Sequence, residues 1–323
     1  MKHHLNTLYV TTQGTYLAKE RETVVVRLEG ETKLRLPLLT LDGIVCFGNV
    51  SVSPFLLGLC GRKGVNVSLL SSNGRFLARV VGETSGNVLL RREQYRRADD
   101  LPRAAEIARS ILRAKVLNGR HVLMRSLRDS PAEDEGDSRA AAVKTLALLG
   151  GQLEKADDLD TLRGIEGAAG RAYFESFDSL IVQQRESFRF EGRSRRPPTD
   201  PVNSLLSFLY TLVRHDVTGA LEGVGLDPQV GFLHRDRPGR AGLALDLMEE
   251  LRAPIADRLA LTLINRQQVR PEGFTTGESG GVVMDDETRK TVLVAYQERK
   301  QVEVKHPFLG EKTTLGLLFH LQA

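Results

Sequence analysis

The sequence predicts an α+β protein with two domains, a small N-terminal β-sheet domain over residues 1–85 and a mostly α-helical domain over residues 86–323. Two observations predict this division: residues with strand-type alternation fill the first part, and apolar residues at helical spacing begin near Val88. In addition, 323 residues, of which 41% are hydrophobic, suffice for two cores of ordinary size.

The N-terminal domain is predicted from segments rich in β-branched residues, separated by glycine and proline. LNTLYVTT, TYLAKERETVVVRLEG and TKLRLPL are broken by Gly14, Gly30 and Pro37, which favours an antiparallel sheet. LDGIVCFG, VNVSLLSS and LARVVG continue the strand pattern, and VSPFLLGLCGRKG between them predicts a short helix. GETSGN at 82–87 is then expected to link the domains.

Helical periodicity dominates the rest of the chain, beginning with NVLLRREQYRRADD and LPRAAEIARSILRAKVLNGRHVLMRSLRD. Cationic side chains line these first helices: Arg91, Arg92, Arg96, Arg97, Arg113, Lys115 and Arg120. Such a row is typical of a solvated helix face, and contact with nucleic acid is the alternative.

Composition narrows the location and the chemistry. There is no run of about 18 apolar residues, and the start MKHHLNTLYV lacks the apolar core of a secretory signal, so we expect a cytoplasmic protein without a membrane anchor. Cys46 and Cys60 stand alone in apolar segments, which predicts buried free thiols. Residues 1–97 carry 14 Lys or Arg against 7 Asp or Glu, an excess consistent with phosphate binding.

Residues 224–258 carry the strongest signal for a functional site. Leu243, Leu247 and Leu251 predict a short amphipathic helix, on which Asp246 and Glu249 lie one turn apart on one side. His234, on the preceding loop DPQVGFLHRDRPGR, is close enough in sequence to reach the same point. Two carboxylates and an imidazole favour a hard cation, Mg²⁺ or Mn²⁺, and a solvated acidic face with a packed histidine is the alternative.

Glu166 is a second candidate acid, in the segment TLRGIEGAAGRAYF. Its neighbours are unusually small, and this surface should allow another helix to approach closely and hold Glu166 in a crevice: Gly164, Gly167, Ala168, Ala169, Gly170 and Ala172. A carboxylate held near other carboxylates must take up a proton or share a cation.

A mixture of cations and aromatics marks a candidate DNA-binding loop. Phe188 and Phe190 stand among five cations, Arg185, Arg189, Arg193, Arg195 and Arg196, and the segment then runs into two prolines. Guanidinium groups bind phosphates and aromatic rings stack on exposed bases, so we expect a mobile DNA-contacting loop. An ordered surface loop with salt bridges is the alternative. Asn203, on the helix that follows, is expected to cap or to hold a neighbour of the site.

Several motifs together resemble the family of CRISPR-associated integrases that is numbered one among the Cas proteins. The resemblance covers nearly the whole chain and is carried by GIEGAAGRAYF, RSRRPPTDPVNSLLSFLY, GLDPQVGFLHRDRPGRAGLALDLMEELRAP and the N-terminal strand pattern. The organisation is most similar to members found with type I-C CRISPR systems.

The resemblance implies a metal site and a reaction. Its metal ligands would be Glu166, His234 and Glu249, the last replacing an Asp found in many members, and Asp246 could share that role. The implied activity is a metal-dependent DNA endonuclease and integrase, which inserts spacers into a CRISPR array by 3′-hydroxyl attack on repeat phosphodiesters, without a covalent enzyme intermediate. This is the adaptation step of an antiviral defence.

The resemblance also implies partners. These are double-stranded and forked DNA, a second copy of the chain bound through the β domain, and the small companion Cas protein numbered two. Two other functions stay open: a metal-dependent nuclease that only hydrolyses DNA, and a non-catalytic DNA-binding scaffold with structural acids.

Overall fold

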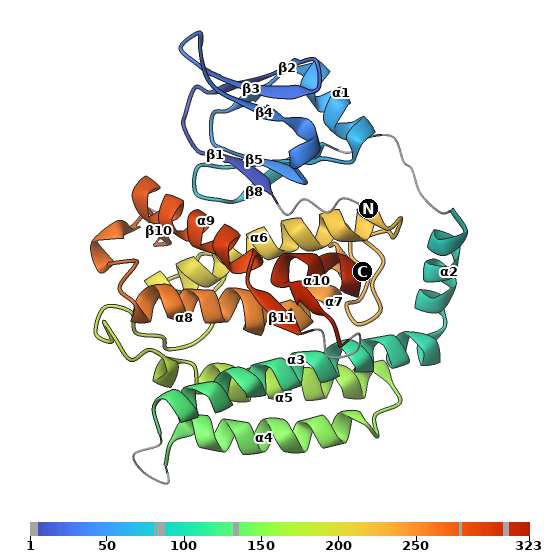
Figure 1. Ribbon diagram of the computed structural model, residues 1–323. Coiled ribbons are helices and arrows are strands. Elements are labelled where there is room, and N and C mark those ends of the chain that lie inside the picture. The colour runs from blue at the N-terminus through green and yellow to red at the C-terminus, as the bar shows by residue number, and fades with distance from the viewer. Residues whose placement is uncertain (1–5, 81, 83–87, 132–135, 278–279, 306–309) are drawn as a thin grey trace. The chain divides into compact units, whose positions relative to one another are not determined.

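The computed structural model describes residues 6–80, 82, 88–131, 136–277, 280–305 and 310–323 (Figure 1). The chain divides into two compact units, one of Met1–Gly86 with Met284–Leu321 and one of Asn87–Val283 with Gln322–Ala323. The first boundary lies beside the predicted one, but the prediction placed the whole of 86–323 in the helical domain. Residues 284–321 depart from it because Gln297 donates to the carbonyl of Thr7 at 3.0 Å and Arg289 donates to that of Ser72.

The first unit contains an α+β arrangement of two four-stranded sheets. One sheet has the order β1-β5-β7-β8 and the other has the order β4-β3-β2-β6. The strands are β1 (Thr7–Val10), β2 (Tyr16–Glu20), β3 (Thr23–Leu28), β4 (Glu31–Pro37), β5 (Gly43–Phe47), β6 (Ser51–Val52), β7 (Asn66–Leu70) and β8 (Phe76–Val80). The expectation of an antiparallel sheet was wrong for β1, β5 and β7, which pair in parallel. The segment between β5 and β7 contains β6 and a helix, which is the crossover that parallel strands require.

The predicted short helix is α1 (Pro54–Lys63). The Ser53 hydroxyl caps it by accepting the N–H of Leu56, and Gly64 ends it at φ 69°, where a side chain would be strained. Cys46 and Cys60 are free thiols buried in the core, as predicted. Burial raises the pKa of Cys46 to about 12 and that of Cys60 to about 11, so both thiols are unreactive.

The second unit is helical, as the periodicity predicts. Its main helices are α2 (Val88–Asp99), α3 (Leu101–Asp129), α4 (Ser138–Leu153), α5 (Leu159–Glu175), α6 (Pro201–Gly223), α7 (Gly242–Leu251) and α8 (Arg258–Asn265). Four of these helices, α3 to α6, begin after an aspartate whose side chain accepts backbone N–H groups: Asp100, Asp137, Asp158 and Asp200. The long helix α3 packs against α4, α5 and α7, so it is the common neighbour of the segments that carry the candidate site.

Pro254 neither ends α7 nor opens a new helix. A π-helical turn, Arg252–Asp257, contains it and continues directly into α8, and a wider turn of this kind absorbs a residue that lacks an N–H. The remaining elements are β9 (Phe274–Thr276), β10 (Val282–Met284), α9 (Asp286–Lys300), β11 (Glu303–Lys305), β12 (Lys312–Thr314) and α10 (Leu315–Gln322), with 3-10 turns at Leu38–Thr40, Asp178–Leu180 and Pro271–Gly273. Within the described ranges, no helix is both long and apolar enough to cross a membrane.

Two glycines on α1 provide a matched test of packing in the first unit. A Cβ at Gly61 would lie 2.9 Å from the Cα of Gly82, whereas a Cβ at the exposed Gly58 would meet only the end of the Arg62 side chain at 3.7 Å. Gly61→Ala should therefore lower the free energy of unfolding by about 1–3 kcal/mol. Gly58→Ala should leave it unchanged or raise it by up to about 1 kcal/mol. Urea unfolding followed by circular dichroism measures both, and equal stabilities would contradict the close approach.

Candidate active site

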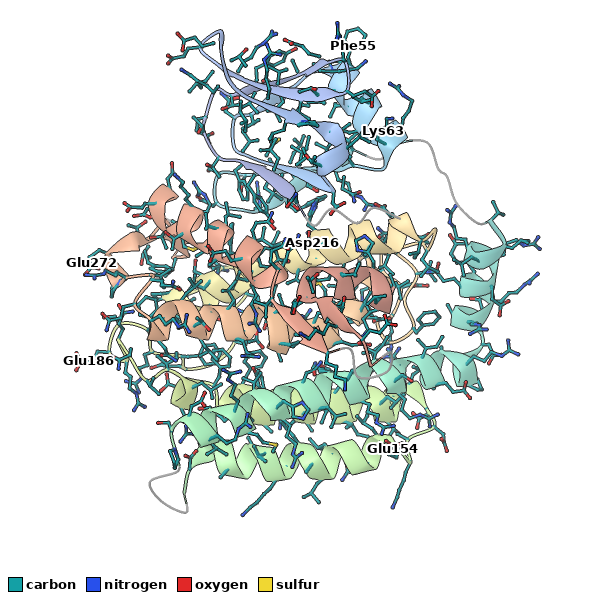
Figure 2. All side chains as sticks on the ribbon, in the orientation of Figure 1. Phe55, Lys63, Glu154, Glu186, Asp216 and Glu272 are labelled. Atoms are coloured by element: carbon teal, nitrogen blue, oxygen red, sulfur yellow. The ribbon has the colours of Figure 1, made fainter. Side chains whose placement is uncertain are left out.

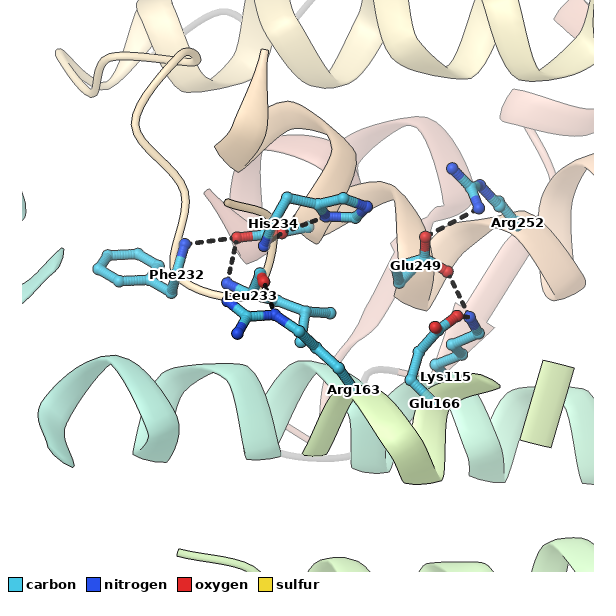
Figure 3. A network of polar contacts seen from close by, with 9 residues as sticks. Lys115, Arg163, Glu166, Phe232, Leu233, His234, Glu249 and Arg252 are labelled. Atoms are coloured by element: carbon cyan, nitrogen blue, oxygen red, sulfur yellow. Dashed lines mark hydrogen bonds and ion pairs between the residues drawn. The ribbon is translucent and has the colours of Figure 1, made fainter. Parts of the chain in front are cut away.

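Asp246 on α7 organises the loop that carries Phe232, Leu233 and His234, the three residues labelled on that loop in Figure 3. Its carboxylate is fully buried and accepts the backbone N–H groups of Phe232 at 2.6 Å, Leu233 at 2.9 Å and His234 at 3.0 Å. The imidazole Nδ1 of His234 lies 2.5 Å from the same carboxylate. Four polar groups therefore converge on one buried side chain, and the loop has little freedom to carry His234 elsewhere.

This contact decides which tautomer His234 adopts. A carboxylate ion can only accept, so Nδ1 carries the hydrogen and Nε2 keeps a lone pair for a metal or a proton. Both oxygens of Asp246 are used by the loop and the imidazole. The arrangement thus supports a positioning role for Asp246, and it does not support sharing of a metal between Asp246 and Glu249.

Two further contacts hold the loop against its surroundings. Gly231 lies so close to α7 that a Cβ there would come within 2.6 Å of the Gly242 carbonyl carbon and 2.7 Å of an Asp246 oxygen. Arg163 on α5 donates from Nε to the Leu233 carbonyl at 2.8 Å. The loop is consequently tied both to α7 and to the helix that carries Glu166.

The beginning of the same loop is fastened to α2. The Gln94 amide donates to the carbonyls of Asp227 at 2.7 Å and Val230 at 2.8 Å, and its oxygen accepts the N–H of Asp227 at 2.9 Å. Because Gln94 is buried, these bonds are protected from water. Gln94 was not among the site residues predicted from the sequence.

Glu166 and Glu249 meet at the ammonium group of Lys115. Nζ of Lys115, on α3, contacts Oε1 of Glu166 on α5 and lies 2.7 Å from Oε2 of Glu249 on α7. The other oxygen of Glu249 lies 2.8 Å from Nη1 of Arg252. Figure 3 shows the two acids and two cations as one network, formed by helices that are far apart in the sequence.

The two cations keep Glu249 ionised inside the protein. Burial favours the neutral acid, but the charges of Arg252 and Lys115, together with the hydrogen bond from Lys115, outweigh it and lower the pKa of Glu249 to about 2. Burial likewise favours a neutral amine at Lys115, but the charges of Glu249 and Glu166 outweigh it and raise its pKa. At neutral pH the network therefore contains two anions and two cations.

The predicted ligands Glu166, His234 and Glu249 do not form a closed metal site. In the part of the chain that the structure describes, no three His, Cys, Asp or Glu side chains are grouped as metal ligands. The Lys115 ammonium group lies between the two acids, at the position that a metal cation would occupy. Oε2 of Glu249 is buried and lies 2.7 Å from this ammonium nitrogen. A position already occupied by a cation, two carboxylates that supply hard oxygen ligands, and Nε2 of His234 together fit Mg²⁺ or Mn²⁺.

The small residues of α5 do not have the packing role that was predicted for them. The helix packs through Leu162, Ile165 and Ala169, whereas Gly164 and Gly167 face outward and a Cβ on either would meet nothing within 4 Å. Among the described residues, no helix covers this glycine face, so the expected crevice was wrong. The Glu166 side chain is instead 33% exposed, which leaves it open to a large substrate.

Arg252 also takes part in a second network of contacts, which is centred on Tyr210. The Tyr210 ring on α6 lies between the guanidinium groups of Arg193 and Arg252, at 5.1 and 5.0 Å, and its hydroxyl donates to buried Asp257 at 2.7 Å. A cavity of about 50 Å³ lies beside Lys115 and Glu249. This volume suits water and excludes a nucleotide.

The candidate DNA loop is only partly as expected. Phe188 and Phe190 are buried and pack against other aromatic rings, for Phe188 the ring of Phe274 at 5.5 Å, so the prediction that they stack on bases was wrong. Arg193 is held by Asn203, whose amide also donates to the Gly192 carbonyl at 2.7 Å. Asn203 thus holds a neighbour of the site, as predicted. The other four cations are exposed: Arg185, Arg189, Arg195 and Arg196.

Two residues of the site were not predicted as such from the sequence: Lys115, which was assigned elsewhere, and Arg252, which was not singled out. Lys115 was assigned to a solvated face, but it is 19% exposed and lies at the same helical spacing as buried Ile111, Leu112 and Gly119. A lysine within an apolar stripe needs an anionic partner, so its position in the stripe could have marked Lys115 as a residue of the site. Arg252 follows Glu249 by three residues, the spacing of an intrahelical ion pair.

The sequence matches the family model described as "CRISPR associated protein Cas1" over residues 8–298. It is 54% identical to a CRISPR-associated endonuclease Cas1 of Chlorobaculum tepidum over 100% of this chain and 94% of that protein. A Cas1 endonuclease of Rhodospirillum rubrum is 52% identical over the same shares. The structure resembles a Cas1 protein from Thermotoga maritima with a TM-score of 0.81 and 25% identity, over 98% of this chain and 94% of that one.

The fold alone is shared with a casposase bound to an integration product, with a TM-score of 0.82 and 21% identity over 98% of this chain and 88% of that one. The family model spans both compact units, and the curated relatives cover every segment that contributes to the His234 loop and to the Lys115 network. The chain therefore belongs to the Cas1 family of CRISPR-associated proteins.

Proposed function

We propose that this protein is a metal-dependent DNA endonuclease and integrase, which joins a DNA 3′-hydroxyl to a phosphodiester of a CRISPR repeat. The observation that carries the proposal is the meeting of Glu166 and Glu249 around one cationic position, with the His234 imidazole held by Asp246 near Glu249 (Figure 3). The names of the curated relatives support nuclease activity, and the shared fold with an integration complex supports joining.

Glu166, His234 and Glu249 would hold Mg²⁺ or Mn²⁺. When bound, such a cation makes a hydroxyl more acidic and offsets the charge that develops on the attacked phosphate. The chain's own residues prepare the site for this chemistry. Asp246 keeps the hydrogen on Nδ1 of His234, and Arg252 holds one oxygen of Glu249 so that the other faces Glu166.

Strand transfer distinguishes this function from its alternatives. The protein is incubated with a 3′-hydroxyl DNA donor, a supercoiled plasmid carrying the repeat, and Mn²⁺. Donor joined to plasmid supports the integrase. Nicked plasmid without joined donor would indicate a nuclease that only hydrolyses DNA, and untouched plasmid would indicate a binding scaffold.

His234→Ala should abolish this strand transfer while leaving the fold intact. Loss of a direct ligand should lower the rate roughly 100-fold or more, since even outer partners of ligands change metal affinity 10- to 100-fold. Asp246 would keep its three backbone donors, so the free energy of unfolding should fall by only about 1 kcal/mol.

Melting curves with and without Mn²⁺ check the same variant. Metal that binds only the folded state raises the melting temperature by mass action, so the increase should be smaller in His234→Ala than in the wild type. His121→Ala, at an exposed position on α3, is the matched control and should retain both activity and the full increase. A His234→Ala protein with the full increase would exclude His234 from the metal site.

Double-stranded and forked DNA are the proposed substrates, and exposed Arg195 and Arg196 are proposed phosphate contacts together with Arg185 and Arg189. Replacing Arg195 and Arg196 with Ala should reduce the salt dependence of binding by about 0.9 in log–log slope per lost contact on duplex DNA, or about 0.7 on single strands. Fluorescence anisotropy across a salt series measures this slope. The matched control replaces Lys144 and Lys155, and an equal effect there would argue against a specific role for the loop.

Arg193 needs a separate variant. It is bound to Asn203 and stacked on Tyr210, so its loss would disturb the second network as well as any DNA contact. For this reason it is left unchanged in the salt experiment.

We also propose that the protein acts as a homodimer and with the small companion protein numbered two. A solved Cas6-RT-Cas1–Cas2 complex supports the second partner, because this chain shares the fold of 34% of one of its chains. The first unit exposes apolar side chains such as Phe55 (81%, Figure 2), Leu39 (63%) and Leu77 (54%). Leu77 lies on β8, at the edge of its sheet, and edge strands tend to be covered by a partner.

Light scattering should report a dimer at micromolar concentration, and Leu77→Glu should weaken it because a charge would be buried against the second copy. Leu148→Glu on α4, which is 71% exposed in the second unit, is the control and should remain dimeric. A wild-type monomer would contradict the proposed assembly.

A further inference from the structure

We propose that Lys115 competes directly with the divalent cation: its ammonium group occupies the Glu166–Glu249 position in the metal-free protein and leaves it when metal binds. The inference rests on the proposed metal dependence and adds to it a residue that sets metal affinity. Lys115 is a positioning residue in this scheme, not a ligand.

The position of the ammonium group is the first support. It contacts one oxygen from each acid, including the buried Oε2 of Glu249 at 2.7 Å. A metal held by both carboxylates would have to use the same space. Since two cations cannot share oxygens at such distances without strong repulsion, one must exclude the other.

The charge balance is the second support. Glu166 and Glu249 carry two negative charges, and Lys115 and Arg252 carry two positive charges. Arg252 is bound to the oxygen of Glu249 that faces away from Glu166, at 2.8 Å, so it can stay when the metal enters. Lys115 alone stands between the acids, on a flexible four-carbon chain that can move its ammonium group to another anion.

An opposite role for Lys115 is conceivable and predicts the opposite result. If the lysine only held the two acids at the correct separation, its removal would loosen them and weaken metal binding. If it competes, its removal frees two oxygens and strengthens metal binding. The direction of the change in affinity therefore separates the two roles.

The experiment compares Lys115→Met with the wild type by titrating Mn²⁺ in a calorimeter at one pH. Lys115→Met should bind Mn²⁺ about 5- to 10-fold more tightly, and its melting temperature should rise more on adding metal. Arg113→Met is the matched control, because it removes an exposed cation from the same helix, and its affinity should stay within about twofold of the wild type.

Weaker or unchanged Mn²⁺ binding by Lys115→Met, with normal binding by the wild type, would overturn the inference alone. Absence of Mn²⁺ binding in both proteins would overturn the proposed metal dependence together with the inference. The two failures are thus distinguishable.

A measurement on the wild type covers the case in which Lys115→Met does not fold. Reductive methylation, mapped by mass spectrometry, reports the accessibility of each lysine. Mg²⁺ should speed methylation of Lys115 several-fold and leave exposed Lys144 unchanged. Equal or slower methylation of Lys115 with Mg²⁺ would show that its ammonium group remains between the acids.

Discussion

The ion pairs of Lys115 determine how three helices of the second unit fit together. Residues 115, 166 and 249 are far apart in the sequence, and their side chains meet because α3 packs against both α5 and α7. Apolar contacts bring helices together but specify their rotation weakly. A buried ion network adds little net stability, yet loss of one member leaves another charge uncompensated, so the contacts of Lys115 disfavour arrangements of these helices that separate the charges.

Two acids one turn apart on α7 have different roles because their neighbours differ. Asp246 faces the irregular loop and binds three backbone N–H groups and an imidazole, whereas Glu249 faces α3 and α5 and binds two cations. The π-helical turn that follows places Arg252 against Glu249 and carries the chain past Pro254 without a break. The loop and the helical core therefore meet on one short helix, which brings an imidazole near a carboxylate pair.

Local signals explain what the sequence could predict. Strand alternation, helical periodicity and the acids around His234 yielded the α+β division, the helices and the candidate residues, because these depend on neighbours within a few positions. The role of Lys115 and the position of residues 284–321 depend on contacts between distant segments, such as that of Gln297 with Thr7. Composition led to two wrong predictions. The glycines of α5 are open to solvent and form no crevice, and Phe188 and Phe190 are core residues that cannot stack on bases. The likeness to type I-C members stays a prediction.

The charge balance of the site also bears on how metal and fold are related. A centre of unpaired acids must bind a cation, or take up protons, before its helices can pack. Here Lys115 and Arg252 already neutralise Glu166 and Glu249, so the helices can pack without metal, and pairing with these cations keeps the pKa of Glu249 at about 2. Under the proposed competition, metal binding would be an exchange of one cation for another within a folded site. The free energy of that exchange would be the difference between two favourable ion contacts, so a residue that never touches the metal would set the affinity of the site.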